Sequence, residues 1–257
     1  MSQTSPRVSV VIPAYEEAET IESVLDRLIE GVSIDSEMLV VVDDLADSTV
    51  PVVQRLADAG APVRVLINTY GRGPAFALRY GIDNASAPVV VVTMADGSDD
   101  PTQIDGLCRL VERGVVIAAA SRYMSGGRQI GGPFFKSLLS RTAGISLYLL
   151  ARVGTRDATN SFKAYRRDFV QAVGIDSDSG FELGLELVAK ARRLRQPVAE
   201  LPTIWIERHV GMSRFKLFAW LPRYLHWYAF AFGPALTIEE LRRRSSRHSP
   251  TREDLPT

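Results

Sequence analysis

The 257-residue chain has one cysteine, Cys108, and no excess of charge of either sign. A single cysteine excludes an intramolecular disulfide and any zinc site built from several cysteines, and it suits a reducing compartment. Because 30 basic side chains balance 30 acidic ones, the net field gives no reason to expect a nucleic-acid partner. No uninterrupted apolar run reaches 18 residues, and no basic segment followed by an apolar one opens the chain. We therefore expect neither a membrane-spanning helix nor a secretory signal, and a cytoplasmic location.

Hydrophobic residues make up 46% of the chain and charged residues 23%, which is typical of a globular protein. The sequence predicts a main domain over residues 1–216, an aromatic amphipathic segment over 217–241 and a basic, disordered tail over 242–257. The aromatic segment contains Trp220 and Trp227 but is interrupted by Pro222 and Pro234. It could lie in a membrane interface, giving peripheral contact at the cytoplasmic face, or pack on the domain, and the sequence leaves both open.

Short apolar runs alternate with helical patterns along the main domain. Strands are predicted at residues 8–12, 38–42, 63–67, 89–93, 117–120 and 197–206, and helices at residues 18–29, 49–57, 75–84, 134–150 and 183–194. This alternation predicts an α/β fold, with a mostly parallel sheet covered by helices on both faces.

Polar side chains follow three of the predicted strands, and ligands of such sheets bind at the carboxyl ends of the strands. The first strand is followed by Pro13 and Tyr15, and the second by Asp43. We expect Asp43 to contact a nucleotide base or ribose, since carboxylates accept hydrogen bonds from N–H and O–H groups. Asp47 is instead expected to cap the next helix.

The fourth predicted strand is followed by an acidic loop, residues 94–101, with three aspartates within five positions. Clustered hard oxygen ligands without a nearby cysteine or histidine favour Mg²⁺ or Mn²⁺, which would neutralise a diphosphate leaving group. Asp96 is the predicted ligand, and Asp100 is assigned to helix capping.

Several segments resemble glycosyltransferase family 2. These are VSVVIPAYEEAETI, VVDDLADST, NTYGRGPAFALRYG and MADGSDDP, in that order along the chain. Further on, SRY, the segment 136–140, DATNSFKAYRRD and ERHVGMSRFKL resemble the branch of dolichol-phosphate mannosyltransferases and bacterial polyprenol-phosphate enzymes. The resemblance covers residues 7–220.

The resemblance implies a GT-A fold and an inverting transfer from a nucleotide-diphosphate sugar, a GDP- or UDP-sugar, to a polyprenyl phosphate. It implies the following site residues: Pro13, Tyr15, Glu17, Asp43 and Asp96 for the donor nucleotide; Arg208 and Arg214 for the donor diphosphate; Arg122, Lys136 and Ser140 for the acceptor phosphate; Asp96 and Ser98 for Mg²⁺ or Mn²⁺; and Asp96 and Arg122 for catalysis. A phosphate monoester is already anionic at pH 7, so it can attack without a general base, and basic donors are what the acceptor side requires.

The sequence also departs from the family. Met94 replaces the usual first aspartate of the metal motif, and Lys136 replaces an arginine, giving a point charge in place of a planar fork. Two other functions therefore stay open. One is transfer to a soluble hydroxyl or amine with Glu182 or Glu186 as the base, and the other is an inactive nucleotide-sugar-binding protein.

Three polar residues near the expected acceptor site are assigned a structural role. Asp157, Asn160 and Lys163 are expected to stabilise the loop around that site without reacting. The sequence carries no signal for an oligomeric state.

Overall fold

A seven-stranded sheet forms the centre of the protein. The computed structural model describes residues 5–207 and 217–245. The strand order is β3-β2-β1-β4-β7-β5-β8. The strands are β1 (Val8–Pro13), β2 (Ser36–Val42), β3 (Val63–Ile67), β4 (Val89–Val92), β5 (Ile117–Ser121), β7 (Lys163–Arg166) and β8 (Val198–Pro202). All run parallel except β7, which lies antiparallel between β4 and β5. The predicted mostly parallel α/β sheet is confirmed, and β7 is the strand of this sheet that the sequence reading missed.

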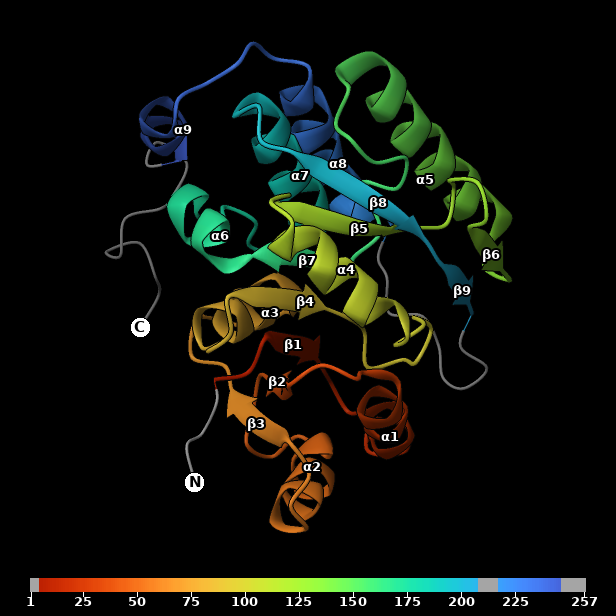
Figure 1. Cartoon of the computed structure of the whole chain (residues 1–257), viewed down its shortest axis with the longest axis vertical. Coiled ribbons are helices and arrows are strands. Elements are labelled where there is room, and N and C mark those ends of the chain that lie inside the picture. Colours follow the sequence, from red (N-terminus) through yellow and green to blue (C-terminus); the bar gives the residue numbers. More distant parts are fainter. Residues whose placement is uncertain (1–4, 208–216, 246–257) are drawn as a thin grey trace.

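Helices cover both faces of this sheet (Figure 1). One face packs against α1 (Ile21–Gly31), α2 (Thr49–Asp58) and α4 (Gln103–Glu112), and the other against α3 (Pro74–Asp83) and α7 (Leu183–Arg193), with α8 (Leu217–Ala231) packed on α7. The first helix shows the cause: Val24, Leu25 and Leu28 form one apolar stripe and are buried. Three further helical segments are α5 (Phe134–Ser146), which continues into the π-turn η1 (Leu147–Ala151), α6 (Arg167–Val173) and α9 (Ile238–Ser245).

The predicted strand over 197–206 is divided into two in the structure. β8 ends at Pro202, which has no backbone N–H with which to continue a ladder. After Thr203 the chain forms β9 (Ile204–Ile206), which leaves the large sheet and pairs with β6 (Arg128–Ile130). This two-stranded ribbon lies beyond the carboxyl end of β8 (Figure 1).

The aromatic segment packs on the domain. Trp227 is 7% exposed and Ala231 is fully buried, and α8 contacts α7 and η1. The tail is predicted to be disordered from residue 242, but residues 242–245 belong to helix α9. Buried Leu241 anchors this helix, and Arg242 Nε donates to Ala172 O at 3.0 Å. In the described ranges 5–207 and 217–245, no helix combines the length and apolar character needed to cross a bilayer.

Candidate active site

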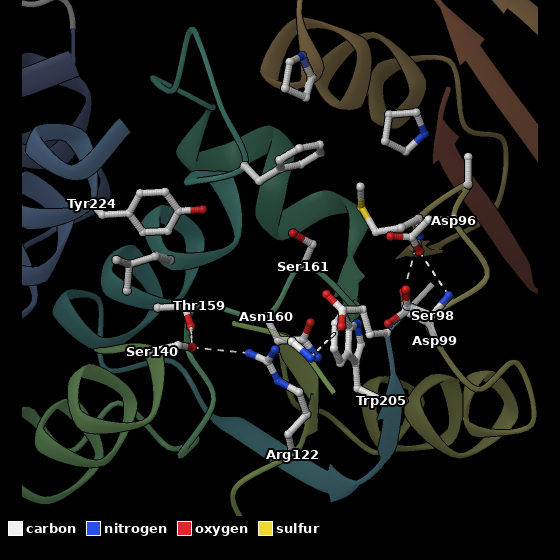
Figure 2. Close-up of a pocket in the computed structure, with 18 of the residues that line it drawn as sticks. Asp96, Ser98, Asp99, Arg122, Ser140, Thr159, Asn160, Ser161, Trp205 and Tyr224 are labelled. Atoms are coloured by element: carbon white, nitrogen blue, oxygen red, sulfur yellow. Dashed lines mark hydrogen bonds between the residues drawn. The ribbon is translucent and has the colours of Figure 1, made fainter. Parts of the chain in front are cut away.

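A cavity of about 710 Å³ opens at the carboxyl ends of β1, β2, β4 and β5. Figure 2 shows Asp96, Ser98 and Asp99 on one side of it and Ser140 and Thr159 on the other. Residues of five regions line it: Pro13, Tyr15, Glu17 and Asp43 near the first strands; Met94, Asp96, Ser98 and Asp99 after β4; Arg122, Tyr123, Ser140 and Thr159; Trp205 and Glu207; and Tyr224, Leu225 and Tyr228 on α8. The cavity therefore collects the strand-end residues that the sequence predicts to act together.

Asp43 fastens the loop before α3 to the end of β2. One carboxylate oxygen accepts from Asn68 Nδ2 at 2.8 Å, and the other accepts from the backbone N–H of Gly73 at 2.7 Å. Gly73 has a φ of 117°, a conformation that favours glycine, and it is the N-cap residue directly before α3. Each carboxylate oxygen has a second lone pair, so Asp43 retains acceptor capacity toward the cavity.

The loop after β1 presents Tyr15 and Glu17 to the cavity, and Tyr15 is 58% exposed. Between them, Glu16 has a φ of 53°, which is uncommon for a residue other than glycine. Buried Asp47 holds this turn by accepting from Glu16 N at 3.0 Å, and it also accepts from Thr49 N at 2.8 Å in the first turn of α2. The sequence predicted only the second contact, which is local. The first joins residues 31 positions apart.

The acidic loop after β4 is ordered by its own backbone. Asp96 accepts from Ser98 N at 3.0 Å, and buried Asp99 accepts from Thr93 Oγ1 at 2.9 Å and from Met94 N at 3.3 Å. Burial, and next the nearby charge of Asp96, raises the pKa of Asp99 to about 7. Asp96 is therefore the carboxylate of this loop that is free to meet a cation from the cavity side.

The residues of this loop fit a divalent cation in part. Ser98 Oγ is buried and has no hydrogen-bond partner among the described residues. Carboxylate and hydroxyl oxygens are hard ligands suited to Mg²⁺ or Mn²⁺, which bind to few protein groups and complete their shell with substrate phosphate and water. Within the described ranges, no group of three or more His, Cys, Asp or Glu side chains forms a metal cage. Asp96 and Ser98 thus suit a metal that is bound together with a diphosphate.

Arg122, directly after β5, is held by buried Asp157. Arg122 N and Nε donate to Asp157 Oδ2 at 2.9 and 2.7 Å, and Nη2 donates to Oδ1 at 2.9 Å. Only 12% of the Arg122 side chain is exposed and none of the Asp157 side chain. Burial alone would lower the pKa of Arg122, but Asp157 more than offsets it and the pKa is raised. Arg122 therefore keeps its charge at the wall of the cavity.

Ser140 lies beside this guanidinium, as the resemblance implied. Arg122 Nη2 approaches Ser140 Oγ at 3.4 Å, and Ser140 Oγ lies 2.6 Å from Thr159 Oγ1 (Figure 2). Lys136 belongs to α5, four residues before Ser140, and the placement of its side chain lies outside what the structure describes. Arg208 and Arg214 also lie outside the described residues.

Lys163 fastens the loop that carries Asp157 and Thr159. Its Nζ is fully buried and donates to the carbonyl oxygens of Ala158, at 3.2 Å, and Asn160. Burial lowers the pKa of Lys163 to about 7, although the charge of Asp157 raises it. These contacts agree with the structural role predicted for Lys163.

The structure contradicts the assignment of Glu186 as a general base. Its carboxylate is fully buried, accepts from Asp176 N and Ser177 N at 2.7 and 2.9 Å, and pairs with Lys190 Nζ at 2.6 Å. Glu182 is also fully buried and accepts from Gly180 N at 2.9 Å. Neither glutamate lines the cavity, so neither is placed to take a proton from an acceptor there.

Sequence reasoning missed three lining residues, Trp205 and Glu207 at β9 and Tyr224 on α8. Trp205 lies on the side of Ser98 and Asp99, and Tyr224 lies on the opposite side, near Thr159 (Figure 2). Glu207 Oε2 accepts from Gly132 N at 2.7 Å and so joins the end of β9 to the loop before α5. The available signal was the aromatic content of 217–238, but which of those residues face the cavity depends on how α8 packs.

The sheet order, the helices on both faces and the polar strand ends define a GT-A architecture. Solved structures with this fold include glucosyl-3-phosphoglycerate synthase from Mycobacterium tuberculosis, determined with Mn²⁺, uridine diphosphate and glucosyl-3-phosphoglycerate. That protein is 19% identical, with a TM-score of 0.66, over 90% of this chain and 82% of its own. A mannosyltransferase from Pyrobaculum calidifontis, determined with GDP-Man and Mn²⁺, is 20% identical, with a TM-score of 0.60, over 95% and 70%.

Residues 9–174 match the family described as Glycosyl transferase family 2. The chain is 32% identical to a dolichol-phosphate mannosyltransferase of Pyrococcus furiosus, over 82% of this chain and 59% of that protein. It is 29% identical to an undecaprenyl-phosphate mannosyltransferase of Micrococcus luteus, over 82% and 88%. The chain belongs to glycosyltransferase family 2, and the predicted family and fold are both confirmed.

Proposed function

We propose that this glycosyltransferase transfers a hexosyl group from a GDP- or UDP-sugar to a polyprenyl phosphate, with inversion at the anomeric carbon. The observation that carries the proposal is the Arg122–Asp157 pair at the cavity wall, with Ser140 beside it. A guanidinium held in this way presents N–H donors in a fixed geometry, which suits the planar recognition of phosphate oxygens. The names of the relatives, mannosyltransferases of dolichol phosphate and undecaprenyl phosphate, support the same acceptor class.

The proposed step requires no general base. A phosphate oxygen of the acceptor forms a bond to the anomeric carbon, and the bond from that carbon to the donor diphosphate breaks. The electron pair leaves with the nucleoside diphosphate, and no proton is transferred because the acceptor phosphate is already ionised at pH 7. The positions of Glu182 and Glu186, buried and outside the cavity lining, agree with this chemistry.

The other proposed site residues divide between binding the donor and binding the acceptor. Pro13, Tyr15, Glu17 and Asp43 would bind the nucleoside, and Asp96 with Ser98 would hold Mg²⁺ or Mn²⁺. A divalent ion there supplies charge that stabilises the departing diphosphate. Lys136 would add a cation for the acceptor phosphate, and Arg208 and Arg214 would bind the donor diphosphate.

A polyprenyl acceptor implies contact with a membrane, and α5 carries the exposed apolar side chains for it. Phe134 and Phe135 are 73% and 81% exposed, and Leu138 and Leu139 are also exposed. Ser140 follows these residues directly, so an apolar surface adjoins the proposed acceptor-phosphate site. We propose that α5 lies in the interface at the cytoplasmic face of the membrane, in place of the aromatic face of α8, whose Trp227 is buried.

A partition assay tests the function. Purified protein is incubated with radiolabelled GDP- and UDP-sugars, a short polyprenyl phosphate and Mn²⁺ or Mg²⁺. Label entering the organic phase with an inverted anomeric configuration is the expected result. Label that stays aqueous with every donor, while uridine or guanosine diphosphate still binds, would show that the acceptor class is wrong.

A matched pair of substitutions locates the acceptor site within that assay. Arg122→Lys keeps the charge but loses the planar fork, so kcat/KM for the acceptor should fall at least tenfold with little change in nucleoside diphosphate affinity. Arg113→Lys, at an exposed position after α4, should leave both quantities unchanged.

A further inference from the structure

A second cavity, of about 580 Å³, lies at the amino end of β8. The ends of η1 and α7 and the residues Pro234 and Ala235 border it. β8 runs from Val198, at this cavity, to Pro202, which pairs with Ser121 beside the candidate active site. Figure 1 shows β8 pointing away from this end toward β9. The two cavities thus lie at opposite ends of the same strand.

Three arginines line the second cavity: Arg152, Arg192 and Arg195. The described residues around it include no acidic side chain. Arg192 is fixed in place, because its Nε donates to Ala151 O and its Nη1 to Gly233 O, both at 2.8 Å. Arg152 and Arg195 are exposed. The cavity therefore has three guanidiniums, one of them fixed by two hydrogen bonds, a composition suited to an anion.

The backbone at two of these arginines is unusual. Arg152 and Arg195 have φ values of 57° and 53°, and in the described part of the chain only Glu16 is a further non-glycine residue with positive φ. Both arginines follow helical segments, η1 and α7, at positions where glycine or asparagine adopts this conformation most easily. An arginine within the last helical turn would also interact favourably with the helix dipole, and it would not need a positive φ. Both arginines therefore adopt a backbone conformation that costs free energy, and such conformations cluster at ligand-binding sites.

An exposed apolar surface leads directly to this cavity. Leu149 and Leu150 of η1 are 63% and 71% exposed and stand two and three residues before Arg152. They continue the helix that exposes Phe134 and Phe135 beside the candidate active site. If α5 lies in the interface, η1 brings the arginines to the depth of the lipid headgroups.

We propose that the arginine pocket formed by Arg152, Arg192 and Arg195 binds the phosphate of an anionic lipid headgroup. The inference rests on the membrane contact of the proposed function but not on the transfer reaction. The leucines of η1 enter the apolar region, the guanidiniums bind phosphate, and the protein is held by both ends of the α5–η1 segment. Arginines next to exposed apolar side chains favour a bilayer headgroup over a free phosphate, which would use only the charges.

Vesicle binding of a charge-removing variant tests the pocket. In Arg152→Asn/Arg195→Asn two cations are lost, while asparagine suits the left-handed backbone, so thermal stability should stay the same or rise. At about 1 kcal/mol for each basic residue near an anionic surface, binding to phosphatidylglycerol vesicles should weaken about 30-fold. Binding to phosphatidylcholine vesicles should change little.

A matched control distinguishes binding at the arginine pocket from general electrostatic attraction to an anionic vesicle. Arg79→Gln/Arg113→Gln removes the same charge from exposed positions on α3 and after α4. It should retain most of the affinity for phosphatidylglycerol vesicles, and an equal loss in both double variants would overturn the proposal. Stabilisation of the wild type by millimolar inorganic phosphate, without preference for phosphatidylglycerol over phosphatidylcholine, would also overturn the lipid assignment.

Transfer to a short polyprenyl phosphate in detergent keeps this test independent of the proposed function. The asparagine variant should transfer sugar at the wild-type rate there, since the pocket is remote from Arg122. Absence of transfer by the wild type would refute the proposed function, whereas unchanged vesicle binding by the asparagine variant would refute only the lipid pocket.

Discussion

Replacing Asp157 by asparagine is the sharpest perturbation of the candidate active site. The carboxylate is fully buried and accepts three hydrogen bonds from Arg122, between 2.7 and 2.9 Å. Asparagine has the same size, but it offers one acceptor oxygen and turns an NH₂ group toward the remaining donors. Arg122, with a side chain 12% exposed, would then be a buried cation without a counter-charge.

Removing one partner of a buried ion pair costs about 3–5 kcal/mol. For a protein of this size each kcal/mol corresponds to about 2–4 °C, so the melting temperature of Asp157→Asn should fall by roughly 6–20 °C. The acceptor site should suffer as well, because Asp157 fixes the plane of the guanidinium. We expect KM for polyprenyl phosphate to rise about tenfold or more, with the affinity for nucleoside diphosphate changed less than twofold.

The matched control is Asp168→Asn, which removes the aspartate of an exposed pair with Arg166. Asp168 is 73% exposed, and such pairs contribute about 0–1 kcal/mol. Urea denaturation and acceptor kinetics of both variants give the comparison. If Asp157→Asn unfolds within 1 kcal/mol of the wild type and keeps its KM for the acceptor, the Arg122–Asp157 pair does not organise this site and the reasoning is wrong.

Three other substitutions extend these expectations. The free energy of unfolding of Lys163→Met should fall relative to that of the wild type as the pH rises from 7 to 10. The pKa of Lys163 is lowered to about 7 in the folded protein, so over this range only the unfolded state binds the proton, and the wild type gains stability. Denaturation curves at several pH values measure the difference, and a constant difference would contradict a buried lysine that folds without its proton. Glu186→Gln should lower stability by about 1–3 kcal/mol, because buried Lys190 loses one counter-charge and keeps only Asp176 at 2.9 Å, and the folded fraction should keep its pH–rate profile. Loss of the acid-side fall in that profile would restore Glu186 as a base. Asp96→Asn should abolish the effect of Mn²⁺ on nucleoside diphosphate affinity in calorimetric titrations, and an undiminished metal effect would place the cation elsewhere.

The sequence was sufficient where the signal is local and failed where it depends on contacts between distant segments. The four apolar runs that became β1 to β4 show strand character on their own, and parallel topology then brings Asp43 and Asp96 to one edge. By contrast, β7 has only four residues and begins with a buried lysine, so its pattern does not read as a central strand. Its identity depends on pairing with β4 and β5.

Glu186, the candidate general base, shows the same limit of prediction from the sequence. Glu186 and Lys190 stand four residues apart on a helix, a spacing visible in the sequence. The pattern does not reveal that both are fully buried and that two backbone N–H groups of residues 176 and 177 also bind the carboxylate. Burial and these distant donors turn a potential proton acceptor into a structural ion pair.

The charges of the candidate active site bear on why the proposed function calls for a cation from outside its own lining. The described ionisable residues that line it are five acidic side chains, Glu17, Asp43, Asp96, Asp99 and Glu207, and two guanidiniums, Arg72 and Arg122. Asp99, with a pKa raised to about 7, carries only part of its charge at neutral pH. Both arginines are already paired, Arg72 with Asp44 and Arg122 with Asp157. Both proposed substrates are anions, a diphosphate and a phosphate monoester, and they would enter an acidic cavity. Electrostatics therefore opposes their binding until positive charge is supplied, and under the proposed function a divalent ion at Asp96 together with Lys136, Arg208 and Arg214 would supply it. The metal would then contribute to donor affinity as well as to the departure of the diphosphate, which is why the expected effect of Asp96→Asn appears in binding and not only in turnover.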